Sequence, residues 1–169
     1  MKLKRLSDLI EIVKSLDKKT LIAVNAVDGH SLEAIAEAVE LGIVSAVVTG
    51  NRDEIIKQCA EKRIDDSLFQ IIQAGTDEEA AGLAVQLAAK TSGCILMKGL
   101  ISSDKFMRAI LNKEAGLLPA GGVLSHVAVD DNPNYHKLLI VSDVAIIPYP
   151  TVLQKIAMTH YLKEMALYL

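Results

Sequence analysis

Short strand-like runs alternate with longer amphipathic runs over most of this chain, and this rhythm constrains the fold more than any other feature. Strands are expected at residues 20–26, 45–49, 69–74 and 94–98, and helices at 6–16, 32–41, 52–62, 76–90 and 102–111, with Ser31, Thr76 and Ser102 or Ser103 as N-caps. Strands that alternate with helices of this length are typical of βαβ units with a parallel sheet. Right-handed crossovers then place helices on both faces, which predicts a three-layer α/β/α fold.

The composition agrees with a parallel sheet covered on both faces. The chain has 169 residues, of which 51% are hydrophobic but only 4% aromatic, so Ile, Leu, Val and Ala must build the core. A chain of this length suits one domain, or one domain and part of another.

The rhythm changes after Gly116. Strand-like runs at 123–129 and 138–142 flank the turn sequence 130–134, which predicts a hairpin and therefore a mostly parallel but mixed sheet. A proline elbow at 148–150 precedes a helix, because Thr151 and Gln154 have capping-box spacing. We expect an α/β domain over residues 1–150, then a helix over 151–169 that leads towards an absent second domain. An apolar stripe on this helix, near its end, needs a cover.

Charge and cysteine content exclude several classes of protein. The net charge of −3 gives no reason to expect a nucleic-acid partner. Cys59 and Cys94 lie far apart, so neither a disulfide framework nor a zinc site is expected. No stretch is apolar enough for a membrane span or signal peptide, which favours a cytoplasmic protein.

Polar residues follow the predicted strands where a ligand crevice would form. Asn25 ends the first strand, Thr49–Arg52 follow the second, and Lys98 with Gly99 ends the fourth. Ligands of open α/β sheets gather at the carboxyl ends of strands, where helix N-termini offer N–H groups to anions. Lys98 would point a cation into this crevice, and Gly99 would let a ligand approach the backbone. A lysine that only reaches solvent fits the residues equally well. Neither a Walker A pattern nor GxGxxG is present.

Three further candidates lie in the predicted hairpin region. Ser125 and His126 are neighbours in one strand, so they face opposite sides and form no catalytic dyad. A half-buried, hydrogen-bonded histidine is the favoured interpretation of His126. Asp143 closes the next strand, where a carboxylate can contact a ligand or cap the turn, the cap being at least as well supported.

Four blocks of sequence occur in an order that resembles a known family. They are AVVTGNR at residues 46–52, MKGLI at 97–101, LSHVAV at 124–129 and YHKLLIVSD at 135–143. Together they resemble the N-terminal portion of the phosphate acetyl/butyryltransferases, with phosphate butyryltransferase the nearer match.

The resemblance implies a fold like that of isocitrate and isopropylmalate dehydrogenases, with an incomplete second domain here. It implies reversible transfer of a short acyl group between coenzyme A and phosphate, a homo-oligomer, and no metal or redox cofactor, coenzyme A being a substrate. It makes Lys98, Gly99, Ser125, His126 and Asp143 cleft-lining, substrate-binding candidates, while the family's catalytic base lies beyond this chain. After Asp143 the family usually has an asparagine where this chain has Ile147, which cannot hydrogen-bond a ligand through its side chain.

Two alternatives stay open beside this interpretation. One is a relative with another substrate, such as the phosphate acyltransferase of phospholipid synthesis. The other is a non-catalytic module that binds phosphate or coenzyme A, or that only assembles with a partner. Thiol release from acyl-CoA in the presence of phosphate separates the enzymatic readings from the second alternative.

Overall fold

The computed structural model describes residues 3 and 5–169 and divides the chain into two compact units. Residues 16–119 form one unit, which we call the sheet unit. Residues 120–169, with the described residues up to Ser15, form the other, which we call the hairpin unit. Each unit is described by itself.

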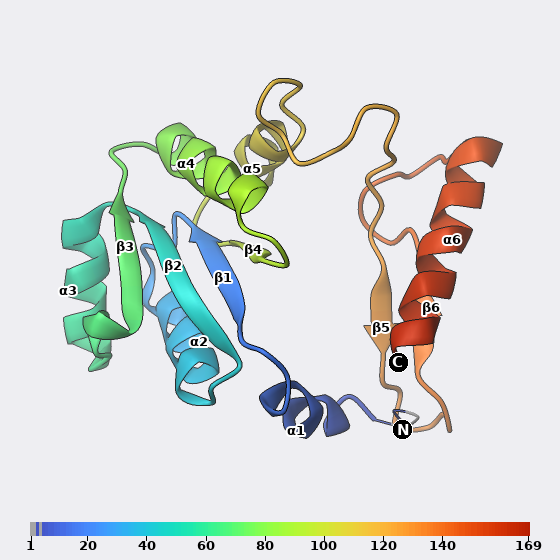
Figure 1. Cartoon of the computed structure of the whole chain (residues 1–169), viewed down its shortest axis with the longest axis horizontal. Helices are drawn as coiled ribbons and strands as arrows, with labels where there is room; N and C mark the ends of the chain where they lie inside the picture. Colours follow the sequence, from blue (N-terminus) through green and yellow to red (C-terminus); the bar gives the residue numbers. More distant parts are fainter. Residues whose placement is uncertain (1–2, 4) are drawn as a thin grey trace. The chain divides into compact units, whose positions relative to one another are not determined.

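The sheet unit contains four strands and four helices in βα alternation (Figure 1). The strands are β1 (Lys19–Val24), β2 (Val44–Gly50), β3 (Phe69–Gln73) and β4 (Ile95–Lys98), and the helices are α2 (Gly29–Glu40), α3 (Arg52–Lys62), α4 (Asp77–Lys90) and α5 (Ser103–Ile110), with a 3₁₀ turn at Asp66–Leu68. The strand order is β3-β2-β1-β4, and every pairing is parallel.

Alternating side chains of the central strands build two separate cores. Leu21 and Ala23 of β1 pack with residues of α2 and α3, whereas Ile22 and Val24 pack with residues of α4 and α5. Successive strand residues face opposite sides of a sheet, so a run that is apolar at every position is buried on both. Figure 1 shows α2 and α3 on one face of the sheet and α4 on the other. The prediction of helices around a mostly parallel sheet is confirmed.

Side-chain caps set where the helices of this unit begin. Asn51, Thr76 and Ser102 each accept a backbone N–H three residues on, as N-caps do. The predicted cap at Ser31 is wrong: Asp28 caps α2, and its Oδ1 accepts the Ser31 N–H at 2.9 Å. The helix therefore begins earlier than expected, because an aspartate upstream provides the acceptor.

The hairpin unit is built from short elements. They are α1 (Asp8–Lys14), β5 (Ala128–Asp130), β6 (Leu139–Val141) and α6 (Val152–Tyr168). Asp131, in the turn after β5, accepts the Leu6 N–H at 2.9 Å and pairs with Arg5 at 3.0 Å. The predicted capping box of α6 is confirmed, since Thr151 and Gln154 each accept the other's backbone N–H.

The prediction of one mixed sheet is wrong. β5 and β6 pair antiparallel with each other, and in the described residues they join no strand of the parallel sheet. A local turn signal predicts that two strands pair, but it carries no information on which sheet they join. The domain over residues 1–150 stays a prediction, although the structure places α6 in one compact unit with the hairpin.

Candidate functional site

The four parallel strands of the sheet unit end at one edge, and the loops beyond them are tied together. After β4, the Gly99 N–H donates to Val24 O and the Leu100 N–H donates to Asn25 O, each at 2.9 Å. These bonds extend the β1–β4 pairing past the last strand residue. The edge is the place where open α/β sheets bind ligands.

Gly99 is required where these two loops meet. A Cβ added at Gly99 would lie 2.7 Å from Ala26 Cα and 2.8 Å from Asn25 O, both main-chain atoms that cannot move aside. The residue is buried, and its lack of a side chain lets the two backbones approach each other.

Lys98, by contrast, is exposed. Its ammonium lies 3.4 Å from the carbonyl oxygen of the next residue, and in the described part of the chain it has no acidic partner. The structure thus leaves this cation open to solvent at the carboxyl end of β4. Both interpretations of Lys98, ligand contact or solvated lysine, still stand.

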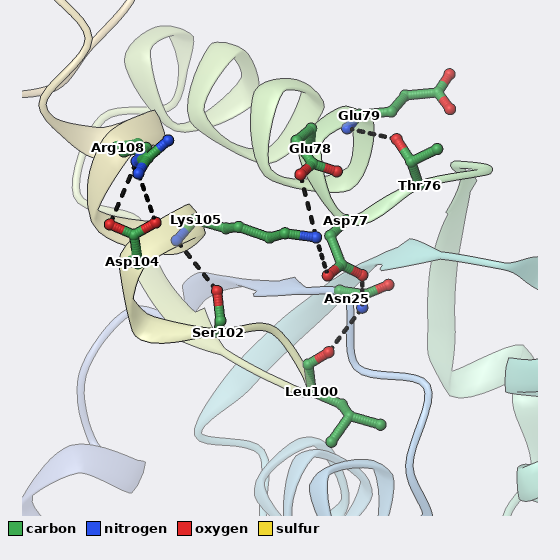
Figure 2. Close-up of polar contacts among 10 residues, drawn as sticks. All are labelled: Asn25, Thr76, Asp77, Glu78, Glu79, Leu100, Ser102, Asp104, Lys105 and Arg108. Carbon is green, nitrogen blue, oxygen red and sulfur yellow. Dashed lines mark hydrogen bonds and ion pairs between the residues drawn. The ribbon is translucent and has the colours of Figure 1, made fainter.

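Asn25 connects three of the loops at this edge. It is 8% exposed and has a left-handed backbone, with φ of 51°. Its amide donates to Asp77 Oδ1 at 3.0 Å and to Leu100 O at 2.7 Å, and its backbone N–H donates to Thr49 Oγ1 at 3.3 Å. Figure 2 shows the amide between Asp77 and Leu100. The sequence places Asn25 at a strand end but does not reveal these partners.

Lys105, which the sequence reasoning missed, ties the start of α5 to the start of α4 (Figure 2). Its ammonium lies 2.8 Å from Asp77 Oδ2 and 3.1 Å from Glu78 Oε1. The bond to Asp77, then that to Glu78, raises the pKa of Lys105, and the same lysine lowers the pKa of Glu78. The sequence does carry a signal of this ion pair: the first turn of α4 is acidic, and the next helix, α5, has a lysine near its start.

The start of α4 is therefore a poor anion site. A cavity of about 240 Å³ lies beside it, lined in part by Asn25, Asn51, Glu54, Thr76 and Asp77. Two of these side chains are carboxylates, and Glu79 Oε2 already accepts the Gly75 N–H at 2.7 Å. The negative charge outweighs the positive end of the helix dipole.

In the hairpin unit, Asp143 is the centre of a hydrogen-bond network. Its Oδ1 accepts the Ala145 and Ile146 N–H groups at 2.8 and 2.7 Å. Its Oδ2 accepts the Ser125 hydroxyl at 2.9 Å and the His126 N–H at 3.0 Å. The carboxylate thus joins the turn after β6 to the segment before β5, as the capping interpretation predicts.

These four donors control the ionisation of Asp143. Partial burial removes water and by itself raises the pKa, but the N–H groups of Ile146, Ala145 and His126 and the Ser125 hydroxyl hold the pKa of the carboxyl well below its usual range. Because a carboxylate with so low a pKa is a weak proton acceptor, Asp143 is unsuited to act as a general base near neutral pH.

The hydroxyl protons in this network are already used. Ser125 gives its single proton to Asp143, so Ser142 must donate in the 2.9 Å contact between the two serine hydroxyls. Neither hydroxyl keeps a proton for a phosphate oxygen in this arrangement. The His126 ring is exposed and forms no hydrogen bond with any described residue, contrary to the favoured expectation of a half-buried histidine.

The structure brings the five predicted site residues together in two groups. Ser125, His126 and Asp143 lie together in the hairpin unit, and Lys98 and Gly99 lie together in the sheet unit. Convergence of both groups on one crevice stays a prediction. Among the described residues, no group of three or more His, Cys, Asp or Glu side chains is placed to hold a metal ion. No described helix combines the length and apolar character needed to cross a bilayer.

Comparison with known proteins shows which solved structure this fold resembles. No family model matches the sequence. A solved structure, a branched-chain phosphotransacylase from Enterococcus faecalis V583, superposes with a TM-score of 0.70 at 24% identity, over 88% of this chain and 51% of that one. This likeness shows an α/β fold of the phosphotransacylase type.

The relatives found by sequence similarity identify the family more specifically than the fold does. The chain is 35% identical over 154 residues to phosphate butyryltransferase of Clostridium acetobutylicum, and 31% identical over 161 residues to phosphate acetyltransferase of Thermotoga maritima. These matches cover 91% and 95% of this chain, but 51% and 54% of the relatives. The predicted resemblance to phosphate butyryl- and acetyltransferases is confirmed, and the chain spans about half the length of these relatives.

Proposed function

We propose that this chain serves the reversible reaction acyl-CoA + phosphate = acyl phosphate + coenzyme A, with a short acyl group. The observation that carries the proposal is the 35% identity to a phosphate butyryltransferase over 91% of the chain. The exposed Lys98 at the ligand edge of a parallel sheet supports it.

The chemistry defines what the protein must supply. A phosphate oxygen attacks the thioester carbonyl, the carbon–sulfur bond breaks, and the thiolate leaves and takes up a proton. Cations and hydrogen-bond donors must hold the phosphate and stabilise the oxyanion of the tetrahedral intermediate. In the reverse direction a base must remove the thiol proton.

This chain offers some of these groups. We assign phosphate contact to Lys98, whose ammonium has no acidic partner among the described residues. The exposed imidazole of His126 is open to contact with a substrate, whereas Asp143 shapes the backbone beside it and does not act as a base. Gly99 and Ser125 support their neighbours rather than bind substrate.

The proposal extends to the setting of the reaction. We propose a homo-oligomeric, cytoplasmic protein with a dehydrogenase-like two-domain fold, which uses coenzyme A as a substrate and needs no metal or redox cofactor. Exposed apolar side chains on α6 and two free cysteines support assembly and a reducing compartment.

The test combines binding with turnover. Calorimetric titration with butyryl-CoA, coenzyme A and phosphate should detect binding, and thiol release from butyryl-CoA should depend on phosphate. Binding without turnover would favour the non-catalytic binding module instead. If neither butyryl-CoA nor phosphate binds at millimolar concentration, the proposed function is wrong.

A further inference from the structure

Leu100, which follows Lys98 by two residues, is held by Asn25 through both of its backbone polar groups. Its N–H donates to Asn25 O at 2.9 Å, and its carbonyl oxygen accepts the Asn25 side-chain amide at 2.7 Å. The first bond fixes the planar peptide group between Gly99 and Leu100. The oxygen of that peptide group, Gly99 O, accepts the Ile101 N–H at 2.9 Å and lies 3.4 Å from the Lys98 ammonium. The surroundings of this ammonium therefore depend on how Asn25 holds Leu100.

The Asp77 carboxylate determines which end of the Asn25 amide faces Leu100. Asp77 Oδ1 accepts an N–H of this amide at 3.0 Å, and the same nitrogen donates to Leu100 O (Figure 2). A carboxylate only accepts hydrogen bonds, so the nitrogen of the amide must face Asp77. Asn25 is 8% exposed, and a reversed amide would place its oxygen against two acceptors with little access to water. Asp77 thereby keeps a donor directed at the Leu100 carbonyl.

Asp77 is itself well placed to act through other residues. It is the first residue of the 14-residue helix α4, and its Oδ2 lies 2.8 Å from the Lys105 ammonium. Both of its oxygens thus already accept donors from the protein. Its negative charge also disfavours direct contact with a phosphate. An effect of Asp77 on phosphate binding must therefore be transmitted through Asn25 and the backbone after β4.

We propose that Asp77 is a positioning residue for Lys98. Through the Asn25 amide it fixes the backbone of residues 99–101, beside which the lysine ammonium lies. This inference rests on the phosphate contact that the proposed function gives to Lys98. An ammonium that is already placed loses less side-chain freedom when an anion binds.

The sign of the effect separates this role from simple electrostatics. Removing a carboxylate strengthens the binding of a nearby anion if only charge matters. Removing a positioning residue weakens that binding. Asp77→Ala should therefore weaken phosphate binding, by no more than the two- to fivefold loss expected when Lys98 itself is removed.

The experiment titrates the whole ¹⁵N-labelled chain with inorganic phosphate at constant ionic strength and follows the backbone amide signals of residues 99–101. Asp53→Ala is the matched control for Asp77→Ala. Asp53 is an exposed acid in the first turn of α3, and its side chain bonds to no other described residue. This control should bind phosphate as tightly as the unmodified chain, or slightly more tightly.

A second variant removes the link between Asp77 and Leu100 without straining the backbone. Asn25 has a left-handed φ of 51°, which glycine adopts readily, so Asn25→Gly removes only the amide. It should weaken phosphate binding by the same factor as Asp77→Ala. The double variant should be no weaker than either single variant, because both substitutions break one connection.

A third comparison shows whether the effect passes through the lysine. In a chain that carries Lys98→Ala, the further change Asp77→Ala should leave the remaining phosphate affinity unchanged. A general loss of structure would weaken binding in both backgrounds. Urea denaturation shows that each variant is folded at the temperature of the titration.

Failure of the positioning role and failure of the function give different results. Unchanged or tighter phosphate binding by Asp77→Ala, losses that multiply in the double variant with Asn25→Gly, or an equal loss without Lys98 would overturn the positioning role alone. If the unmodified chain binds no phosphate at millimolar concentration, the proposed function is wrong, and the positioning role is wrong with it.

Discussion

At the scale of single residues, Asp143 and Lys98 show that two predicted site residues can have opposite roles. The two carboxylate oxygens of Asp143 accept three backbone N–H groups, from residues 126, 145 and 146, and the Ser125 hydroxyl. Lys98 directs its ammonium at no described acid and lies exposed at a strand end. One residue fixes the conformation of a turn, and the other is available to a ligand.

Asp143→Asn should destabilise the hairpin unit, because an amide replaces one acceptor oxygen by a donor that faces N–H groups. The pKa of the Asp143 carboxyl is lower in the folded chain than in the unfolded chain, where it is near 4. The carboxylate therefore stabilises the fold at pH values above about 4, and this stabilisation is lost as the pH falls from there towards the pKa of the folded state. We therefore expect the melting temperature of the unmodified chain to fall more steeply from pH 5 to pH 2 than that of the variant. The control is Asp130→Asn, an exposed aspartate of β5. Parallel pH profiles for the unmodified chain and Asp143→Asn would contradict the network.

Lys98→Ala should weaken phosphate or butyryl-CoA binding about two- to fivefold, the range for one exposed charge. Because the side chain is exposed and packs into no core, the melting temperature should stay nearly constant. Lys90→Ala is the matched control, since Lys90 is an exposed lysine at the opposite end of α4 from the ligand edge. A large fall in melting temperature with unchanged binding would make Lys98 a structural residue.

At the scale of elements, the loops after β1 and β4 form one unit because Gly99 lets their backbones touch. Gly99→Ala would force a Cβ to within 2.8 Å of main-chain atoms of residues 25 and 26. We expect a loss of about 1–3 kcal/mol in the free energy of unfolding, as for an overpacked core. Urea denaturation measures it.

Gly82→Ala is the opposite control for that prediction. Gly82 lies within α4, and a Cβ there meets no atom within 4 Å. Replacing a helical glycine by alanine should raise the free energy of unfolding by about 0.5–1 kcal/mol. Equal effects of the two substitutions would mean that Gly99 is not in close contact.

The elements could be predicted largely from local sequence. Apolar periodicity and capping side chains predicted the strands and helices of residues 16–119, and the capping box predicted α6. The extent of β5 and β6 was overestimated, because apolar runs such as LSHVAV meet the pattern of a strand even where no neighbour pairs with them. Which sheet a hairpin joins depends on tertiary contacts.

The candidate site was less predictable than the elements. The edge of the sheet followed from strand direction alone, and with it the positions of Asn25 and Lys98. The Asn25–Asp77–Lys105 network was missed, because it joins residues far apart in sequence, and the acidic first turn of α4 with a lysine in α5 does not say which residues pair. The capping role of Asp143 was anticipated, but its number of donors depends on a turn that only the fold creates.

At the scale of the whole molecule, burial is divided unequally. Both hydrophobic clusters lie entirely within the sheet unit, whereas the described hairpin unit buries Met158 alone. Many apolar side chains of the latter are exposed, among them Tyr149, Leu153 and Tyr168 at 92%, 78% and 87%. Apolar burial is the main source of stability, so the two units should differ in stability.

An excised fragment of residues 16–119 should therefore fold on its own. We expect helical circular dichroism and one cooperative urea transition, because its cores need no residue from outside. The matched fragment 120–169 should show neither. A fragment 16–119 without cooperative unfolding would mean that the sheet unit depends on the rest of the chain.

The close approach of Gly99 to Ala26 would also affect the phosphate binding proposed for Lys98. Two backbone hydrogen bonds, from the N–H groups of Gly99 and Leu100, fix the main chain just after Lys98. A phosphate that binds the lysine would therefore not have to order a loop. Within the protein, binding would then restrict only the torsions of the lysine side chain, and a preorganised anchor of this kind gives more affinity per contact than a mobile loop would. A substitution of Gly99 would then weaken phosphate binding without altering any atom that contacts the phosphate.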